Sequence, residues 1–222
     1  MTRPVLSPHQ AKGGDWPVGR FRTLPRNVQA FGYVPDIAKL MAGDVVLFSG
    51  AGFVPWAIRS AQLVAQFDPS HAVWTHAALY VGKGTLVEAV PVHGVRVAPL
   101  VEATFGRTLL VRRRRKTADG ASELSMEQRY TVVIDALAQI KRGYSLGLVP
   151  ALAWNALRQT LGRPVAGHVA GVVICSNIIS RAYMTALQLA LSAATTDVTW
   201  PADLSFCEEL DDIPIGWVKV AA

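Results

Sequence analysis

The chain has 222 residues, of which 51% are hydrophobic and 17% are charged, so it carries enough apolar surface for one substantial core. This composition excludes an intrinsically disordered tail protein. The sequence contains no run of about 18 uninterrupted apolar residues, so a membrane-spanning helix is not expected. With 22 Lys and Arg against 16 Asp and Glu, the formal net charge is +6, and much of the excess lies in one run, Arg112–Lys116.

The basic run Arg112–Lys116 directly follows an apolar segment, Thr108–Val111. A patch for nucleic acid or another acidic polymer is one interpretation of such a run. We favour the solvated end of a strand, because no DNA- or RNA-binding motif and no interleaved aromatic residues accompany the run. No nucleic-acid partner is therefore expected.

The first 40 residues are rich in proline, glycine and polar residues, and they predict an irregular N-terminal arm. A single domain is expected over residues 41–222. The first twenty residues contain no apolar segment of the kind found in secretory signal peptides. We therefore expect synthesis in the cytoplasm without Sec-dependent export.

Short apolar runs bounded by glycine and proline predict strands, most of them in the first half of the chain. The first follows the arm, and the next two form a hairpin around Gly82–Gly84. The expected strands are 44–49, 74–81, 85–90, 94–98, 107–113 and 217–220.

Apolar residues at helical spacing dominate the second half of the chain. The most regular pattern is 175–191, where one apolar stripe runs along the whole segment. The expected helices are 55–67, 126–141, 149–161 and 175–191, with shorter turns at 101–105 and 201–204. This order of elements favours an α+β fold with helices packed on one face of an antiparallel sheet.

Cys175 is a candidate nucleophile, because it begins the most regular predicted helix and lies on the face of its apolar stripe. The N-terminus of a helix carries about half a positive charge and leaves backbone N–H groups unpaired. Both properties favour a thiolate and can stabilise an oxyanion. The alternative is a buried structural cysteine, since free cysteines commonly behave as small hydrophobic residues.

A nucleophilic cysteine needs a base, and His76 is the one histidine inside a well-defined predicted strand. Glu88 lies in an otherwise apolar run on the partner strand, where an unpaired carboxylate is costly to bury. A three-residue loop, Gly82–Gly84, places Ala78 opposite Glu88 and makes His76 its diagonal neighbour, about 7–8 Å away at Cα. A two-residue loop would turn Glu88 to the opposite face. A buried core histidine is the alternative interpretation of His76.

No metal or organic cofactor is expected. His71 and His76 are close in sequence, but no third ligand lies near them, and the two cysteines lack neighbouring Cys or His at zinc-binding spacing. The glycine-containing segment Ser49–Gly52 lacks the lysine of a phosphate-binding loop.

Four segments taken together resemble a known family: Gly43–Leu47, Thr75–Gly82, Leu86–Ala89 and Cys175–Tyr183. They look like the permuted branch of the NlpC/P60 papain-like superfamily, which includes YiiX-type amidases and is related to the lecithin:retinol acyltransferase-like proteins. His76 precedes Cys175, which is the permuted order, and the resemblance covers approximately residues 40–210. It implies a papain-like fold, in which a small antiparallel sheet or barrel packs against the nucleophile helix.

The resemblance also implies roles for particular residues. Cys175 would be the nucleophile, His76 the general base and acid, and Glu88 the residue that orients His76. Tyr144 stands where a tyrosine of the family often contributes to the oxyanion hole, with Tyr80 as a rival on the His76 face. Asn177 replaces the acidic or small residue often found two positions after the cysteine, which bears on substrate preference.

The activity implied by the resemblance is a cysteine hydrolase, either a peptidase or an amidase, that forms a thioester acyl-enzyme. Its expected substrates are cell-wall (peptidoglycan) peptides, and a basic protein is attracted to an anionic wall. The matching hypothesis for localisation is a leaderless export route into a target periplasm, as an antibacterial effector.

Two alternative functions stay open from the sequence. One is a lipid acyltransferase or phospholipase that uses the same Cys–His pair, with the apolar segment Leu148–Val173 lining an acyl groove or contacting a membrane surface. The other is a papain-like binding module without catalysis. The sequence does not predict an oligomeric state or the exact bond cleaved.

Overall fold

The computed structural model describes residues 33–91, 93–104, 107–114, 123–140, 174–192 and 199–219. Within these ranges the chain forms a six-stranded antiparallel sheet in the order β5-β4-β3-β2-β6-β7, and a small two-stranded sheet of β1 and β8. The strands are β1 (Tyr33–Pro35), β2 (Val45–Ser49), β3 (His76–Gly82), β4 (Thr85–Val90), β5 (Gly94–Pro99), β6 (Thr108–Arg114), β7 (Leu210–Ile213) and β8 (Trp217–Lys219).

The described residues also form six α-helices. They are α2 (Phe53–Val64), α3 (Pro69–Ala72), α4 (Leu100–Thr104), α5 (Met126–Leu137), α7 (Cys175–Leu187) and α8 (Pro201–Phe206), with a 3₁₀ turn, η2, at Ile37–Lys39. The expected α+β class and antiparallel sheet are confirmed, but the expected packing of helices on one face alone is wrong, because α4 packs on the face opposite α5 and α7. The expected helix 149–161 lies outside the described residues.

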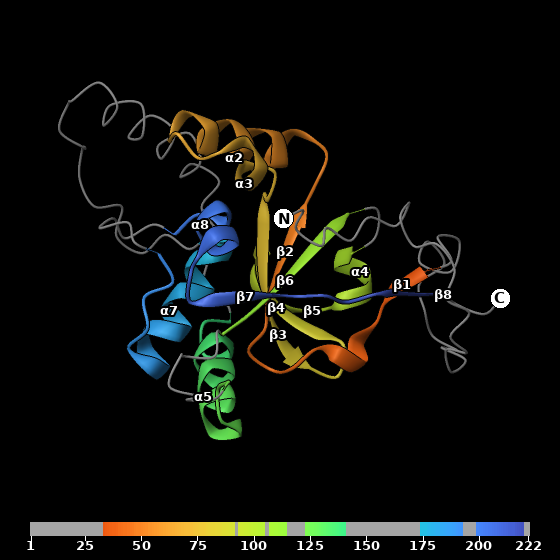
Figure 1. Ribbon diagram of the computed structural model, residues 1–222, viewed down its shortest axis with the longest axis vertical. Coiled ribbons are helices and arrows are strands. Elements are labelled where there is room, and N and C mark those ends of the chain that lie inside the picture. The colour runs from red at the N-terminus through yellow and green to blue at the C-terminus, as the bar shows by residue number, and fades with distance from the viewer. Residues whose placement is uncertain are drawn as a thin grey trace.

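The alternation of side chains along β3 separates two apolar clusters. Ala77 and Leu79 face the cluster that includes buried residues of α5 and α7, whereas Ala78 and Tyr80 face a second cluster that includes α4 and Trp217 of β8. Figure 1 shows the same division, with α5 and α7 on one side of the sheet and α4, β1 and β8 on the other. The central strands are therefore covered on both faces.

The two long helices form for reasons visible in their sequences. In α5, Ser125 and Gln128 make a reciprocal capping box at the N-terminus. In α7, Ile178, Ile179 and Ala182 are buried along one stripe, and the helix ends where Gln188 takes a left-handed conformation, φ 53°. Within the described residues, no helix is both long and apolar enough to cross a membrane.

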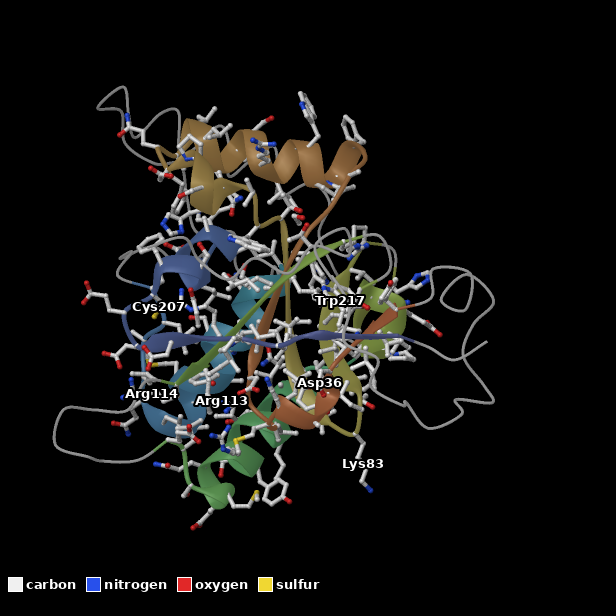
Figure 2. The ribbon with its side chains drawn as sticks, turned by 45° about the vertical axis from the view of Figure 1, so that its right-hand side comes forward. Asp36, Lys83, Arg113, Arg114, Cys207 and Trp217 are labelled. Atoms are coloured by element: carbon white, nitrogen blue, oxygen red, sulfur yellow. The ribbon has the colours of Figure 1, made fainter. Side chains whose placement is uncertain are left out.

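The β3–β4 hairpin has the predicted register but a different turn. Ala78 lies opposite Glu88, as predicted, yet Gly82 rather than Val81 pairs with Thr85, so the connection is two residues long. A β-bulge at Val81 supplies the extra residue that keeps Glu88 on the predicted face. The turn residues, Lys83 and Gly84, both have positive φ, and Lys83 projects from the tip of the hairpin in Figure 2.

Two strands lie where the sequence predicts none. β1 falls inside the expected irregular arm at residues 1–40 and pairs with β8, while residues 1–32 lie outside the described part of the chain. β7 is short and acidic, but Asp211 and Asp212 are the cross-strand partners of Arg113 and Arg112 on β6. Opposite charges facing each other across the ladder stabilise this pairing.

The start of the basic run, Arg112 and Arg113, is not the solvated strand end that we favoured from the sequence, and Arg115 and Lys116 lie outside the described residues. Arg112 and Arg113 are only 5% and 8% exposed. Arg113 binds both carboxylate oxygens of Asp44, and Arg112 pairs with Asp212 and donates to backbone carbonyls around β7. Burial of these guanidinium groups is possible because each has an anionic partner from a distant segment.

Candidate active site

Cys175 is the first residue of α7 and is 2% exposed. Its sulfur accepts hydrogen bonds from the backbone N–H groups of Ser176, in the first turn of the same helix, and of Ala77 on β3. The preceding residue, Ile174, provides no side-chain cap for the helix. The positive end of α7 and two backbone donors therefore converge on the thiol.

His76 is the first residue of β3, and its ring connects Cys175 with Glu88. The ring makes a side-chain hydrogen bond with Cys175, and its Nε2 lies 2.8 Å from Oε2 of Glu88. Because Nε2 is engaged by Glu88, Nδ1 is the nitrogen left for the thiol. The structure thus brings Cys175, His76 and Glu88 together from three elements: α7, β3 and β4.

The protonation states of this chain of groups favour an ion pair. Burial raises the pKa of the Cys175 thiol, but the positive charge and hydrogen bond of His76 outweigh burial and lower it below its usual value. Burial by itself lowers the pKa of His76, whereas the negative charge of Cys175 and the bond to Glu88 raise it to about 9. Both shifts favour a thiolate next to an imidazolium over a neutral thiol next to a neutral imidazole.

Glu88 is ionised although its side chain is 2% exposed. Burial raises the pKa of this carboxyl, but the hydrogen bonds and positive charges of His76 and Arg96 lower it to about 2. An ionised carboxylate accepts hydrogen bonds and cannot donate them, so Nε2 of His76 carries the proton in this contact. This contact fixes the tautomer and the orientation of the ring.

One face of the His76 ring is covered by an aromatic residue. Phe48 is the cross-strand neighbour of His76 on β2, and the two ring centroids lie 5.6 Å apart. Arg107 lies over the Phe48 ring, 5.9 Å from its centroid. The His76 side chain keeps 15% of its surface exposed, so the ring is held in place but is not sealed from solvent.

The structure describes two of the three other residues considered for the site. Tyr144 is outside the described residues. The hydroxyl of Tyr80, its rival, accepts a hydrogen bond from the Gly84 N–H at the hairpin turn and is not at the thiol. Asn177 accepts a hydrogen bond from the Thr199 N–H, and the Ser176 hydroxyl donates to the Thr199 carbonyl. Both bonds tie the start of α7 to the chain before α8.

His71 and His76 do not form a pair. Nδ1 of His71 lies 2.7 Å from the hydroxyl oxygen of Ser205 on α8, and its ring contacts Phe206. Across the described ranges, no group of three or more His, Cys, Asp or Glu side chains is arranged to hold a metal ion.

Arg96 and the Ala77 N–H group are the site features that sequence reasoning missed. Arg96 donates two hydrogen bonds to Oε1 of Glu88. The expected strand 94–98 already contained this arginine, and its register with β4 would have placed it opposite Glu88. A backbone donor such as Ala77 leaves no signal in residue type.

No family model matches the chain, and no curated protein matches its sequence. Among solved structures, the chain is similar to the crystal structure of YiiX from Escherichia coli O157:H7, which is described as a metalloprotein of DUF1105. The TM-score is 0.53, with 17% identity over 79% of this chain and 97% of that chain. At this identity the similarity shows that the chain has a YiiX-like fold.

Proposed function

We propose that the protein is a cysteine hydrolase that cleaves amide bonds through a thioester acyl-enzyme. The observation that carries the proposal is the hydrogen-bonded series Cys175–His76–Glu88, with the thiol at the N-terminus of α7. A nucleophile, a base in contact with it and a third group that orients the base are the components of this chemistry.

The reaction follows from the resting ion pair. The Cys175 thiolate attacks the carbonyl carbon and forms a C–S bond, and the carbonyl oxygen becomes an oxyanion. The C–N bond then breaks as protonated His76 gives its proton to the leaving amine. Neutral His76 next takes a proton from water, which attacks the thioester and releases a carboxylic acid. The thiolate and the imidazolium are restored, and Glu88 stays ionised throughout.

Cell-wall peptides are the substrate class that we propose. The family resemblance of the motifs around Cys175, His76 and Glu88 suggests it, and the net charge of +6 favours association with an anionic wall. The segment on which the lipid acyltransferase alternative depended, Leu148–Val173, lies outside the described residues. That alternative enters the test below as a separate outcome.

The test is digestion of purified peptidoglycan, with the released muropeptides identified by mass spectrometry. We expect wild-type protein to cut peptide stems, and Cys175→Ala to lower the rate by roughly 10⁴-fold. Cys207→Ala is the matched control, because Cys207 is also a buried free thiol but its pKa is raised by burial. Figure 2 shows Cys207 near Arg114, whose charge acts against that rise.

Two results would count against the proposal. Fatty-acid release from phospholipid vesicles, lost in Cys175→Ala and unaccompanied by muropeptide release, would assign the same thiol to lipid chemistry. Equal activity of Cys175→Ala and wild type on every substrate would favour the alternative that the protein is a binding module without catalysis.

A further inference from the structure

The two oxygens of the Glu88 carboxylate have different partners. Oε2 binds the His76 ring at 2.8 Å, while Oε1 accepts from Arg96 Nε at 3.0 Å and Nη2 at 2.8 Å. The Glu88 side chain is 2% exposed and the Arg96 side chain is 44% exposed. A half-exposed guanidinium thus holds the buried carboxylate on the side opposite His76.

The position of Arg96 is set by strand register. It lies on β5 directly opposite Glu88, so the two Cβ atoms are close neighbours across the ladder. The guanidinium is planar and its N–H groups have a fixed arrangement, so two of them bonded to one oxygen restrict the position of that oxygen. Rotation of the Glu88 carboxylate away from His76 would therefore break both Arg96 hydrogen bonds.

We propose that Arg96 is a positioning residue for the hydrolase, which holds the Glu88 carboxylate charged and aimed at His76. This inference rests on the function proposed above and extends the site by one residue, giving the series Arg96–Glu88–His76–Cys175. Arg96 acts through Glu88 and makes no contact with the thiol that the structure records.

The charges around Glu88 support this assignment. The strongest effects of charged groups on Glu88 come from His76 on β3 and Arg96 on β5. The third element packed on β4, helix α7, contributes Cys175, which acts on His76. Without Arg96, Oε1 would be left buried without a cationic partner, and burial favours the protonated carboxyl. A protonated Glu88 would no longer stabilise the imidazolium.

The kinetic test compares Arg96→Met, which removes charge and donors but keeps an unbranched stem, with Arg96→Lys, which keeps the charge. The control is Arg59→Met, which removes the same charge from an exposed position on α2. We expect Arg96→Met to lower kcat roughly 10- to 100-fold with KM within about twofold of wild type. Arg96→Lys should recover part of that loss, and Arg59→Met should leave kcat unchanged.

A second readout does not depend on activity. In a Cys175→Ala background, carbon-13 NMR follows the titration of the Glu88 carboxyl, and Arg96→Met should move that titration to higher pH. A shifted titration in a protein that has no hydrolase activity would leave the Arg96 assignment standing while the proposed function fails. The same kcat and the same Glu88 titration in Arg96→Met as in Arg59→Met would overturn the assignment. If circular dichroism shows that Arg96→Met does not fold, Arg96→Gln replaces it in both measurements.

Discussion

Two buried carboxylates, Glu88 on β4 and Asp44 just before β2, each bind an arginine, yet their surroundings differ in kind. Both oxygens of Asp44 are held by Arg113, at 2.7 and 2.8 Å, and one also accepts the Met41 N–H. In Glu88, by contrast, one oxygen accepts from Arg96 and the other binds the His76 ring.

Asp44 accepts hydrogen bonds from a permanently charged guanidinium and a backbone amide, which do not exchange protons near neutral pH. Glu88 also binds a guanidinium, that of Arg96, but its second partner is an imidazole in contact with a thiol. Burial alone therefore does not distinguish a carboxylate that stabilises the fold from one that belongs to the candidate active site. The distinguishing feature of Glu88 is a titratable partner that contacts the candidate nucleophile.

Among variants that distinguish the Glu88 region from the Asp44 region, His76→Ala is expected to have the largest effect on the reaction rate. Loss of the proposed general base and acid should lower the rate of the proposed hydrolysis by about 10²–10⁴-fold, and it should return the Cys175 pKa to at least about 8.5. Iodoacetamide labelling of Cys175 across a pH series, read by mass spectrometry, measures that pKa. His71→Ala is the control histidine, and equal labelling profiles for the two variants would contradict the ion pair.

Asp44→Asn should act on stability and not on the chemistry of the thiol. It leaves the buried Arg113 without its anion, and loss of one partner of a buried pair costs about 3–5 kcal/mol. Urea unfolding measures the loss of free energy, while the labelling profile of Cys175 should stay that of wild type. An unchanged unfolding midpoint would show that Arg113 finds another partner.

Glu88→Gln is the smaller change at the site, because the glutamine oxygen can accept the His76 N–H bond, although its NH2 group then faces Arg96 and cannot accept from it. The negative charge of Glu88 helps to raise the pKa of His76 to about 9, so its removal lowers that pKa. The imidazolium is lost as pH rises through its pKa, and the alkaline fall in kcat should therefore move to lower pH. We expect a roughly 10-fold lower rate at neutral pH. An alkaline limb at the wild-type position would argue against the coupling.

The sequence predicted much of this site, because alternation along a strand is a local property. A predicted three-residue loop assigned His76 and Glu88 to one face, which the structure reaches through a two-residue loop and a bulge that was not predicted. The helix pattern placed Cys175 at an N-terminus. The Asp44 region could not be foreseen in the same way. Its arginine lies on β6, far along the chain from Asp44, and a basic run next to an apolar strand gives no sign of which anion it will meet.

The bulge at Val81 has a consequence for how mutations in this chain should be interpreted. Gly82, beside it, has a φ of +106°, which other residues rarely adopt, although no atom stands within 4 Å of an added Cβ. If Gly82→Val slid the hairpin into an unbulged pairing, the carboxylate at 88 would point towards α7. A mutational scan would then record a loss of activity at Gly82 as though the residue took part in the reaction, although its role is to keep the strand register of the hairpin.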